Sequence, residues 1–165
     1  MQKKTKFEVR RITQQFKAAY TGGAWHGPAV KQALTGISAV QAAARPVKDA
    51  HSIWEIVLHV AGWQKVVARR AKGEKIRQPD EGDWPEVGVV NSANWKKTLQ
   101  NLDKSYRNLH KTISGLSDAD LTKTVRGIKN YRYIILHGVI QHNLYHAGQI
   151  MLLKKALGAG RQRGK

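Results

Sequence analysis

Two histidines, His142 and His146, lie four residues apart in the strongly apolar segment 137–150, which opens with His137. A spacing of four places two side chains on one face of an α-helix, so both imidazoles can reach a common ion. Imidazole nitrogen is a good ligand for zinc, nickel, copper and iron. At about 100° per residue, His137 points roughly 140° away from His142 and is not expected to join the pair. The segment therefore predicts two ligands for a divalent metal.

Two predicted helices bring a third histidine, His59, towards this pair. Inward-facing positions with helical spacing are Ile56, His59, Trp63 and Val66 on one helix, and Ile135, Val139, His142, His146, Gln149, Leu153 and Leu157 on the last. Burying imidazoles without partners would cost about 2 to 7 kcal/mol per polar group. A metal ion removes this cost, and three protein ligands with one open position are typical of catalytic zinc.

The alternative is a structural role for these histidines. Pairs with this spacing also arise by chance, and a buried histidine is often satisfied by a carboxylate or a backbone carbonyl. No glutamate follows His142, which excludes the HExxH metalloprotease mechanism. The chain has no cysteine, so disulfides, cysteine–zinc sites and a cysteine nucleophile are also excluded.

The periodicity predicts an all-α four-helix bundle with long crossover connections. The expected long helices cover residues 4–20, 52–73, 92–114 and 130–157. Shorter helical pieces are expected after Gly27 and Pro28, over 38–44, and near Ser117–Asp120. The loop 73–90 is long enough to fold over a site. One domain is expected over 1–157, with a basic, disordered tail over 158–165.

The formal charge of +18 predicts attraction to polyanions, although neither a zinc-finger spacing nor an aromatic RNA-binding pattern accompanies it. The chain starts without the apolar core of a secretory signal, and no run of 18 apolar residues is present. A cytoplasmic protein with no membrane segment is therefore expected.

The segments "HSIWEIVLHVAGW", "AWHGPAV" and "HGVIQHNLYHAGQI", followed by "MLLKKA", resemble the DinB/YfiT-like family of metalloenzymes over about residues 4–157. This resemblance implies a bundle, often dimeric, that holds nickel or zinc with one histidine from the second long helix and two from the fourth. The matching positions are His59, His142 and His146. Characterised relatives include thiol-dependent isomerases and transferases, which implies a metal-bound low-molecular-weight thiol as nucleophile. Metal-bound water would instead give a hydrolase.

Other residues have both a chemical and a structural interpretation. Glu55 is a candidate base or ligand-orienting residue, but with Ser52 it also forms a capping box. Gln149 is a candidate partner for metal-bound water, although an amide that ties two helices together is the favoured role. The remaining candidates are Trp63 as a pocket wall or core residue, Trp25, His26 and Trp84 as residues at the site entrance or loop anchors, and Gly138 as a source of space beside His142.

Three classes of function follow. The first is a metal-dependent transferase or hydrolase acting on a small molecule. The second is a module that binds nucleic acid or another polyanion, with binding that weakens steeply with salt. The third is a helical bundle in which a metal only stabilises the fold.

Overall fold

A computed structural model describes residues 5–25 and 27–158, which contain seven helices and no strand. The helices are α1 (Phe7–Thr21), α2 (Val30–Leu34), α3 (Ala39–Ala43), α4 (Ile53–Ala71), α5 (Ser92–Gly115), α6 (Asp118–Leu121) and α7 (Arg132–Ala156). The predicted all-α class and the four long helices are confirmed, although the first helix begins at Phe7. Of the expected tail, only Gly158 lies among the described residues.

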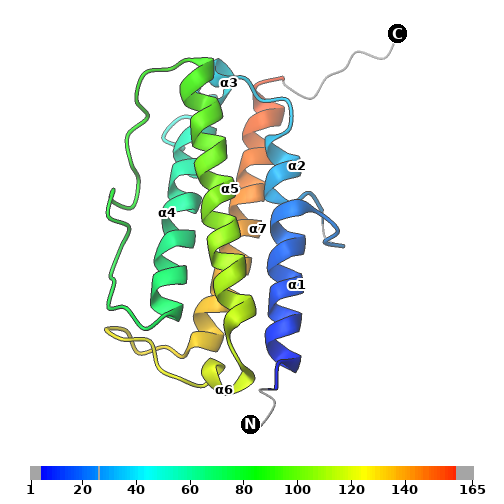
Figure 1. Cartoon of the computed structure of the whole chain (residues 1–165). Helices are drawn as coiled ribbons and strands as arrows, with labels where there is room; N and C mark the ends of the chain where they lie inside the picture. Colours follow the sequence, from blue (N-terminus) through cyan, green and yellow to red (C-terminus); the bar gives the residue numbers. More distant parts are fainter. Residues whose placement is uncertain (1–4, 26, 159–165) are drawn as a thin grey trace.

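The four long helices, α1, α4, α5 and α7, lie side by side (Figure 1). Both α4 and α1 pack against α5 and α7, so α4 is diagonal to α1. Helices α1 and α7 run in one direction, whereas α4 and α5 run in the other (Figure 1). Because α4 and α5 are parallel, the chain must return along the whole bundle between them, which confirms the predicted long crossover.

Side-chain caps explain where several helices begin. At the start of α4 the Ser52 hydroxyl accepts a hydrogen bond from the Glu55 amide at 3.2 Å, and the Glu55 carboxylate accepts one from the Ser52 amide at 2.7 Å. This is the predicted capping box. Asn91 caps α5 by accepting from the amide of Asn94 at 2.8 Å. These caps fix the first residues of the two parallel helices.

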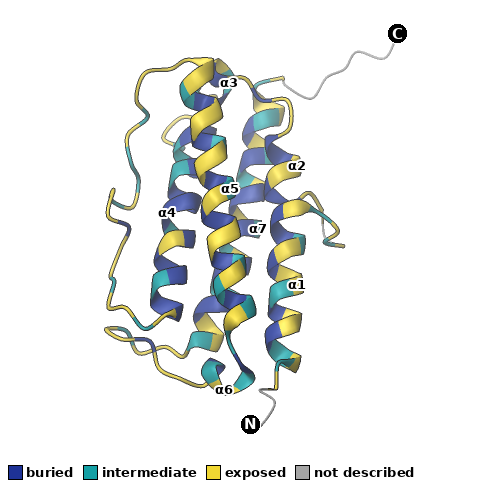
Figure 2. Ribbon diagram, viewed as in Figure 1, coloured by how far each residue is buried: buried dark blue, intermediate teal, exposed yellow. Residues whose placement is uncertain are grey.

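Helix α7 buries two adjacent stripes of side chains, whereas the sequence predicted one. The predicted stripe is buried at Ile135, Val139, His146 and Leu153, and partly buried at His142, Gln149 and Leu157. The second stripe contains Leu136, Ile140, Asn143, Ala147 and Ile150. Buried residues consequently cover much of this helix (Figure 2). The histidines lie beside the central core and not in its middle.

The segment 72–91, which we call the crossover loop, runs beside α4 (Figure 1). Lys65 on α4 pairs with Glu81 at 2.7 Å, and Arg69 pairs with Glu74 and Asp80 at 2.8 and 2.9 Å. A Cβ atom added to Gly62 would lie 3.1 Å from Pro79. The small size of Gly62 therefore lets the loop approach the middle of α4 closely.

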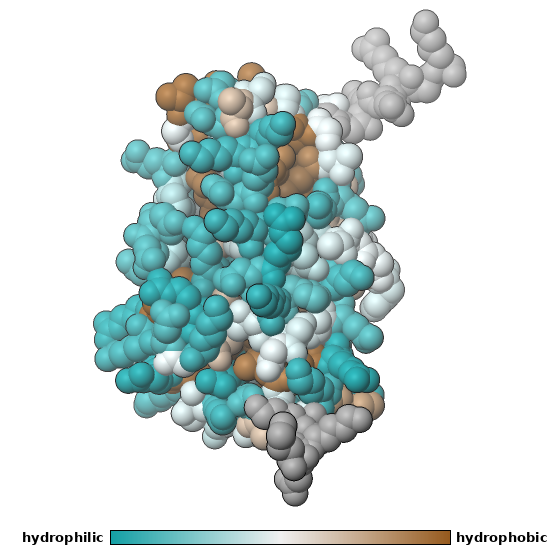
Figure 3. Space-filling model, viewed as in Figure 1, coloured by the Kyte–Doolittle hydropathy of each residue, from teal (hydrophilic) through white to brown (hydrophobic). Residues whose placement is uncertain are grey.

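Most of the face seen in Figure 3 is hydrophilic, with small hydrophobic areas towards both ends. Within residues 5–25 and 27–158, no helix has the length and apolar character required to cross a membrane.

Candidate metal site

The structure brings His59 of α4 together with His142 and His146 of α7. The Nε2 atom of His142 lies 2.9 Å from that of His59 and 3.1 Å from that of His146. The side chains of His59 and His146 are only 6% and 3% exposed, and His142 is partly buried. We call these residues the three-histidine site. The convergence predicted from spacing on two separate helices is therefore present.

The outer nitrogens of two rings are held by hydrogen-bond acceptors. His59 Nδ1 lies 2.7 Å from the backbone oxygen of Asp83 and 3.2 Å from its carboxylate. His146 Nδ1 lies 2.6 Å from the side-chain oxygen of Gln149. Because these partners accept hydrogen bonds, both Nδ1 atoms carry the proton, which leaves both Nε2 atoms with a free lone pair.

This arrangement fits a bound cation. A proton on His142 Nε2 could satisfy only one of its two neighbouring nitrogens at a time. A metal ion would accept all three lone pairs, and ligands at the usual zinc–nitrogen distance would lie about 3.4 Å apart, close to the separations from His142. His142 Nδ1 is buried and has no hydrogen-bond partner among the described residues. The group could therefore hold a divalent metal.

The histidines on α7 are suited to remain neutral. Burial lowers the pKa of His142 to about 3, with further lowering by the charges of His146 and His59. Burial also lowers the pKa of His146 to about 4, although its hydrogen bond to Gln149 acts in the opposite direction. Since only neutral imidazole can donate a lone pair to a metal, both rings are ready to bind one at neutral pH.

The crossover loop covers the site with an aromatic side chain. The Trp84 indole stacks on His59 with a centroid distance of 3.9 Å and an angle of 8°. The His51 ring also stacks on this indole, at 3.6 Å and 5°. Trp84 is thus a neighbour of the site. Sequence reasoning did not identify Asp83 or His51. For Asp83 the available signal was the length and position of the crossover loop, whereas His51 lies just before α4.

Trp63 closes another side of the site. Its ring lies edge-on to His59 and His142, with centroids 6.3 and 6.5 Å away. Its indole nitrogen donates a hydrogen bond to the Asp83 carboxylate at 2.7 Å. Trp63 therefore contributes both a wall and an anchor for the segment that contacts His59.

Glu55 is fully engaged in other interactions. Besides its capping box, its carboxylate pairs with Arg45 and lies 3.7 Å from His51. Burial alone would raise the pKa of Glu55, but hydrogen bonds from Ser52 and the charges of Arg45 and His51 lower it overall. These contacts favour the structural interpretation, while a catalytic role stays a prediction.

Gln149 does not make the contact between two helices that the sequence favoured. Its side-chain oxygen contacts His146 on the same helix, so this interaction does not tie two helices together. The spacing of three residues on α7 brings the amide directly to the outer nitrogen of the ring. Gln149 is therefore placed to orient His146.

Unlike Trp84, the predicted entrance residue Trp25 lies away from the three-histidine site. Trp25 is 97% exposed and lines a shallow cavity with Pro28, Gln32, Met151 and Lys154. None of the three histidines lines that cavity. His26 lies outside the described residues.

Two cavities lie near the three-histidine site, of which the first is lined by His142 and the second by none of the three histidines. The first, of about 250 Å³, is the α4–α7 cavity, and its lining includes Trp63, Arg70, Gly138 and His142. The second, of about 310 Å³, is the His51 cavity, and its lining includes His51 and Gln149. Gly138 was expected to leave space beside His142, and a Cβ atom there would meet no described atom within 4 Å.

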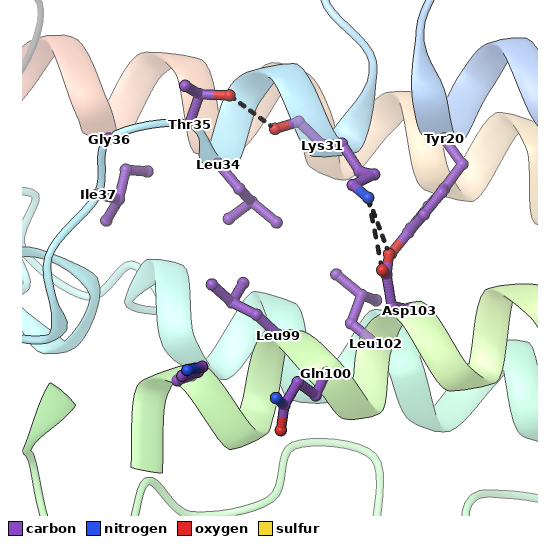
Figure 4. Close-up of a pocket in the computed structure, with 11 residues that line it drawn as sticks. Tyr20, Lys31, Leu34, Thr35, Gly36, Ile37, Leu99, Gln100, Leu102 and Asp103 are labelled. Atoms are coloured by element: carbon purple, nitrogen blue, oxygen red, sulfur yellow. Dashed lines mark hydrogen bonds and ion pairs between the residues drawn. The ribbon is translucent and has the colours of Figure 1, made fainter. Parts of the chain in front are cut away.

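A third cavity, of about 420 Å³, lies between α2 and α5, away from the histidines (Figure 4). Tyr20 donates a hydrogen bond to Asp103 at 2.7 Å, and Lys31 pairs with the same carboxylate at 3.3 Å. Burial and the neighbouring carboxylate raise the pKa of Tyr20 well above its ordinary value. These three polar groups satisfy one another and hold the bundle together.

Comparison with protein families agrees with the geometry. A sequence model of the DinB superfamily matches residues 24–150, a range that includes all three histidines. No curated protein and no solved structure matches the chain significantly. Because the family match covers well over half of the 165 residues, the chain belongs to the DinB superfamily.

Proposed function

We propose that this protein is a metal-dependent enzyme in which His59, His142 and His146 bind one divalent ion, zinc or nickel. The observation that carries the proposal is the convergence of three Nε2 atoms whose outer nitrogens, in two of the three rings, are held by Asp83 and Gln149. Such outer hydrogen bonds orient histidine ligands and raise their basicity. Three protein ligands leave room for a small molecule on the metal.

When bound, the metal would supply acidity to a coordinated thiol or water and so provide a nucleophile at neutral pH. The chain's own residues would hold the imidazoles in one tautomer, and Trp84 and Trp63 would limit access of water. Because the chain contains no cysteine, a sulfur nucleophile would have to come from a low-molecular-weight thiol. We place thiol transfer first, because the α4–α7 cavity is lined by His142 and could hold a second substrate beside a metal-bound thiol. Hydrolysis is the alternative.

The experiment that tests this proposal is elemental analysis of protein purified without a histidine tag. Wild type is expected to carry close to one zinc or nickel ion per chain, and His59→Ala and His146→Ala are expected to lose it. His137→Ala is the matched control, because His137 lies on α7 next to Tyr133 and outside the three-histidine site. Equal metal content in all four proteins would refute the ligand assignment.

A second measurement separates an enzyme from a bundle that uses metal only for stability. Metal-loaded wild type is assayed for consumption of a low-molecular-weight thiol in the presence of an electrophile, and for ester hydrolysis. Metal-dependent turnover that His146→Ala abolishes supports catalysis. Stoichiometric metal with no turnover and no binding of thiol or substrate analogues would favour the purely structural role.

The homodimer implied by the family resemblance belongs to this proposal. Light scattering of the metal-loaded protein would test it, and a mass corresponding to one chain would refute it.

A further inference from the structure

We infer that the α4–α7 cavity binds a small organic carboxylate, and that Arg70 recognises its charge. This inference rests on the proposed function, because the same cavity is lined by His142 of the three-histidine site. A molecule held by Arg70 would therefore lie beside the metal. The inference names the chemical class of the substrate that the metal centre would act on.

Arg70 is a buried cation without a carboxylate partner. Its side chain is only 8% exposed. Nε donates to the backbone oxygen of Ile76 at 2.9 Å, and Nη2 donates to that of Arg77 at 2.8 Å. Among residues 5–25 and 27–158, no acidic side chain lies within ion-pair distance of it. A guanidinium has five N–H groups, so three donors have no hydrogen bond to these residues.

The neighbouring Arg69 differs from Arg70 in having acidic partners. Arg69 pairs with Glu74 and Asp80, whereas Arg70, one residue later, has only carbonyl partners. Burial of a charge without an opposite charge is costly. The two carbonyls hold the guanidinium in place but do not neutralise it. An anion in the cavity would supply the missing charge.

The other residues that line the cavity indicate the character of the uncharged part of the ligand. Most of them are apolar, namely Trp63, Val67, Ile134, Ile135 and Val139. The Arg70 guanidinium lies 5.6 Å from the Trp63 ring, which fixes one boundary between the charged and the apolar parts. The volume of about 250 Å³ lies below the usual range for drug-sized ligands. A small molecule with one charged end and a short apolar body fits these walls.

One uncompensated cation favours a singly charged group. A carboxylate matches the planar guanidinium and carries one negative charge. A phosphate dianion would need a second cation at the same position, and no lysine or further arginine lines this cavity. The net charge of +18 would also raise the local concentration of anions around the protein.

The test uses phenylacetate and its neutral amide, phenylacetamide, titrated calorimetrically into the metal-loaded protein. Wild type is expected to bind the acid at least 10-fold more tightly than the amide. Arg70→Gln is expected to remove this preference, whereas Arg69→Gln, at the adjacent and only partly buried position, is expected to keep it. Equal affinity of wild type for acid and amide would overturn the inference, as would an unchanged preference in Arg70→Gln.

A second variant keeps the test decisive if Arg70→Gln does not fold. Gly138→Leu would place a side chain in the cavity from a helical position that has no neighbour within 4 Å. We expect this variant to weaken phenylacetate binding by more than 10-fold. Gly148→Leu, at an exposed position of the same helix, is the control and should bind like wild type. Unchanged binding in Gly138→Leu would overturn the proposed location.

Metal content, measured on the same samples, separates the two proposals. Wild type without bound metal would refute the proposed function, whatever the titration shows. A metal-loaded protein that does not prefer the acid would refute only the carboxylate inference. A preference that disappears in His146→Ala but persists in Arg70→Gln would show that the metal, and not Arg70, binds the carboxylate, which also overturns the inference.

Discussion

Two buried polar clusters lie next to each other between α4 and α7, yet donors and acceptors are paired differently in them. In the first, which we call the polar core cluster, Gln64 donates to Asn143 at 3.2 Å and accepts from Ser105 at 2.8 Å. In the second, the three-histidine site, ring nitrogens with lone pairs face each other. Each contact of the polar core cluster pairs a donor with an acceptor, although the Asn143 amide nitrogen has no partner among the described residues. In the three-histidine site, a single proton on His142 Nε2 would face two acceptors and could satisfy only one of them. The first cluster can hold helices together by itself, whereas a cation would satisfy all the facing nitrogens of the second.

The largest expected effect is that Gln64→Leu and His142→Leu rank in opposite orders for stability and for metal affinity. Gln64→Leu leaves the Asn143 side-chain oxygen without its partner, whereas the Ser105 hydroxyl keeps the Leu102 carbonyl as an acceptor at 2.8 Å. This change should lower the free energy of unfolding of the metal-free protein by about 1 to 3 kcal/mol. His142→Leu removes a ring whose proton can satisfy only one of the two nitrogens that face it, so stability should change by less than about 1 kcal/mol. Urea unfolding in the presence of a chelator measures both values.

The same two variants should rank in the opposite order for metal binding. Competition with a chromophoric chelator is expected to show that His142→Leu weakens metal affinity by more than about 100-fold, because it removes a ligand. Gln64→Leu should remain within about threefold of wild type. If both variants lost stability and metal affinity to the same degree, the distinction between the clusters would be wrong.

A smaller effect is expected for the hydrogen bond that orients His146. Gln149→Leu should weaken metal affinity by about 10- to 100-fold, the usual cost of losing an outer partner of a histidine ligand. Gln141→Leu, at an exposed position of α7, serves as the control and should leave the affinity unchanged. An affinity for Gln149→Leu equal to that of the control would remove Gln149 from the site.

Lowering the pH should reduce the stability of the metal-free protein through the three-histidine site. The pKa values of His142 and His146 are lowered in the fold to about 3 and 4, so the unfolded chain binds more protons below its own histidine pKa of about 6.5. The contribution of these two groups is therefore complete above pH 6.5 and is lost as the pH falls. Unfolding of the metal-free protein, measured from pH 7 to 4.5, should show this decrease. The slope should be smaller in His142→Leu, and superimposable profiles would contradict the assignment.

The smallest expected effect concerns the crossover loop, which contacts His59 of the three-histidine site through Asp83 and Trp84. Gly62→Ala gains up to about 1 kcal/mol in helix propensity but places a methyl group 3.1 Å from Pro79. We expect little net change in global stability and faster proteolysis within the crossover loop. Ala61→Gly is not expected to displace the loop. Unchanged proteolysis in Gly62→Ala would show that Pro79 moves aside without loosening the loop.

The helices could be predicted from the sequence because helix-forming signals are local. The spacing of Leu102, Leu109 and Ile113 marks α5, and Ser52 with Glu55 marks the start of α4. The positions of His59, His142 and His146 on inward faces also follow from helical periodicity. These features need no knowledge of how distant segments pack.

The partners of the site could not be predicted, because tertiary packing decides them. The Asp83 contact to His59 uses a backbone oxygen, which every residue possesses, so no residue type signals it. Trp84 was one of several loop aromatics, and only the path of the crossover loop places it on His59. The burial of Gln64 and Asn143 could not be predicted either, because amides are usually expected on the surface.

The histidine contact between α4 and α7 joins positions 83 residues apart in the sequence. An ion held by both helices would therefore act as a reversible cross-link that closes a loop of about half the chain. Unlike a disulfide, this link would form only once folding has brought the histidines together, so the ion would stabilise the folded chain in proportion to its concentration. In a chain that has no cysteine, metal supply would thus set how firmly the two halves of the chain are joined.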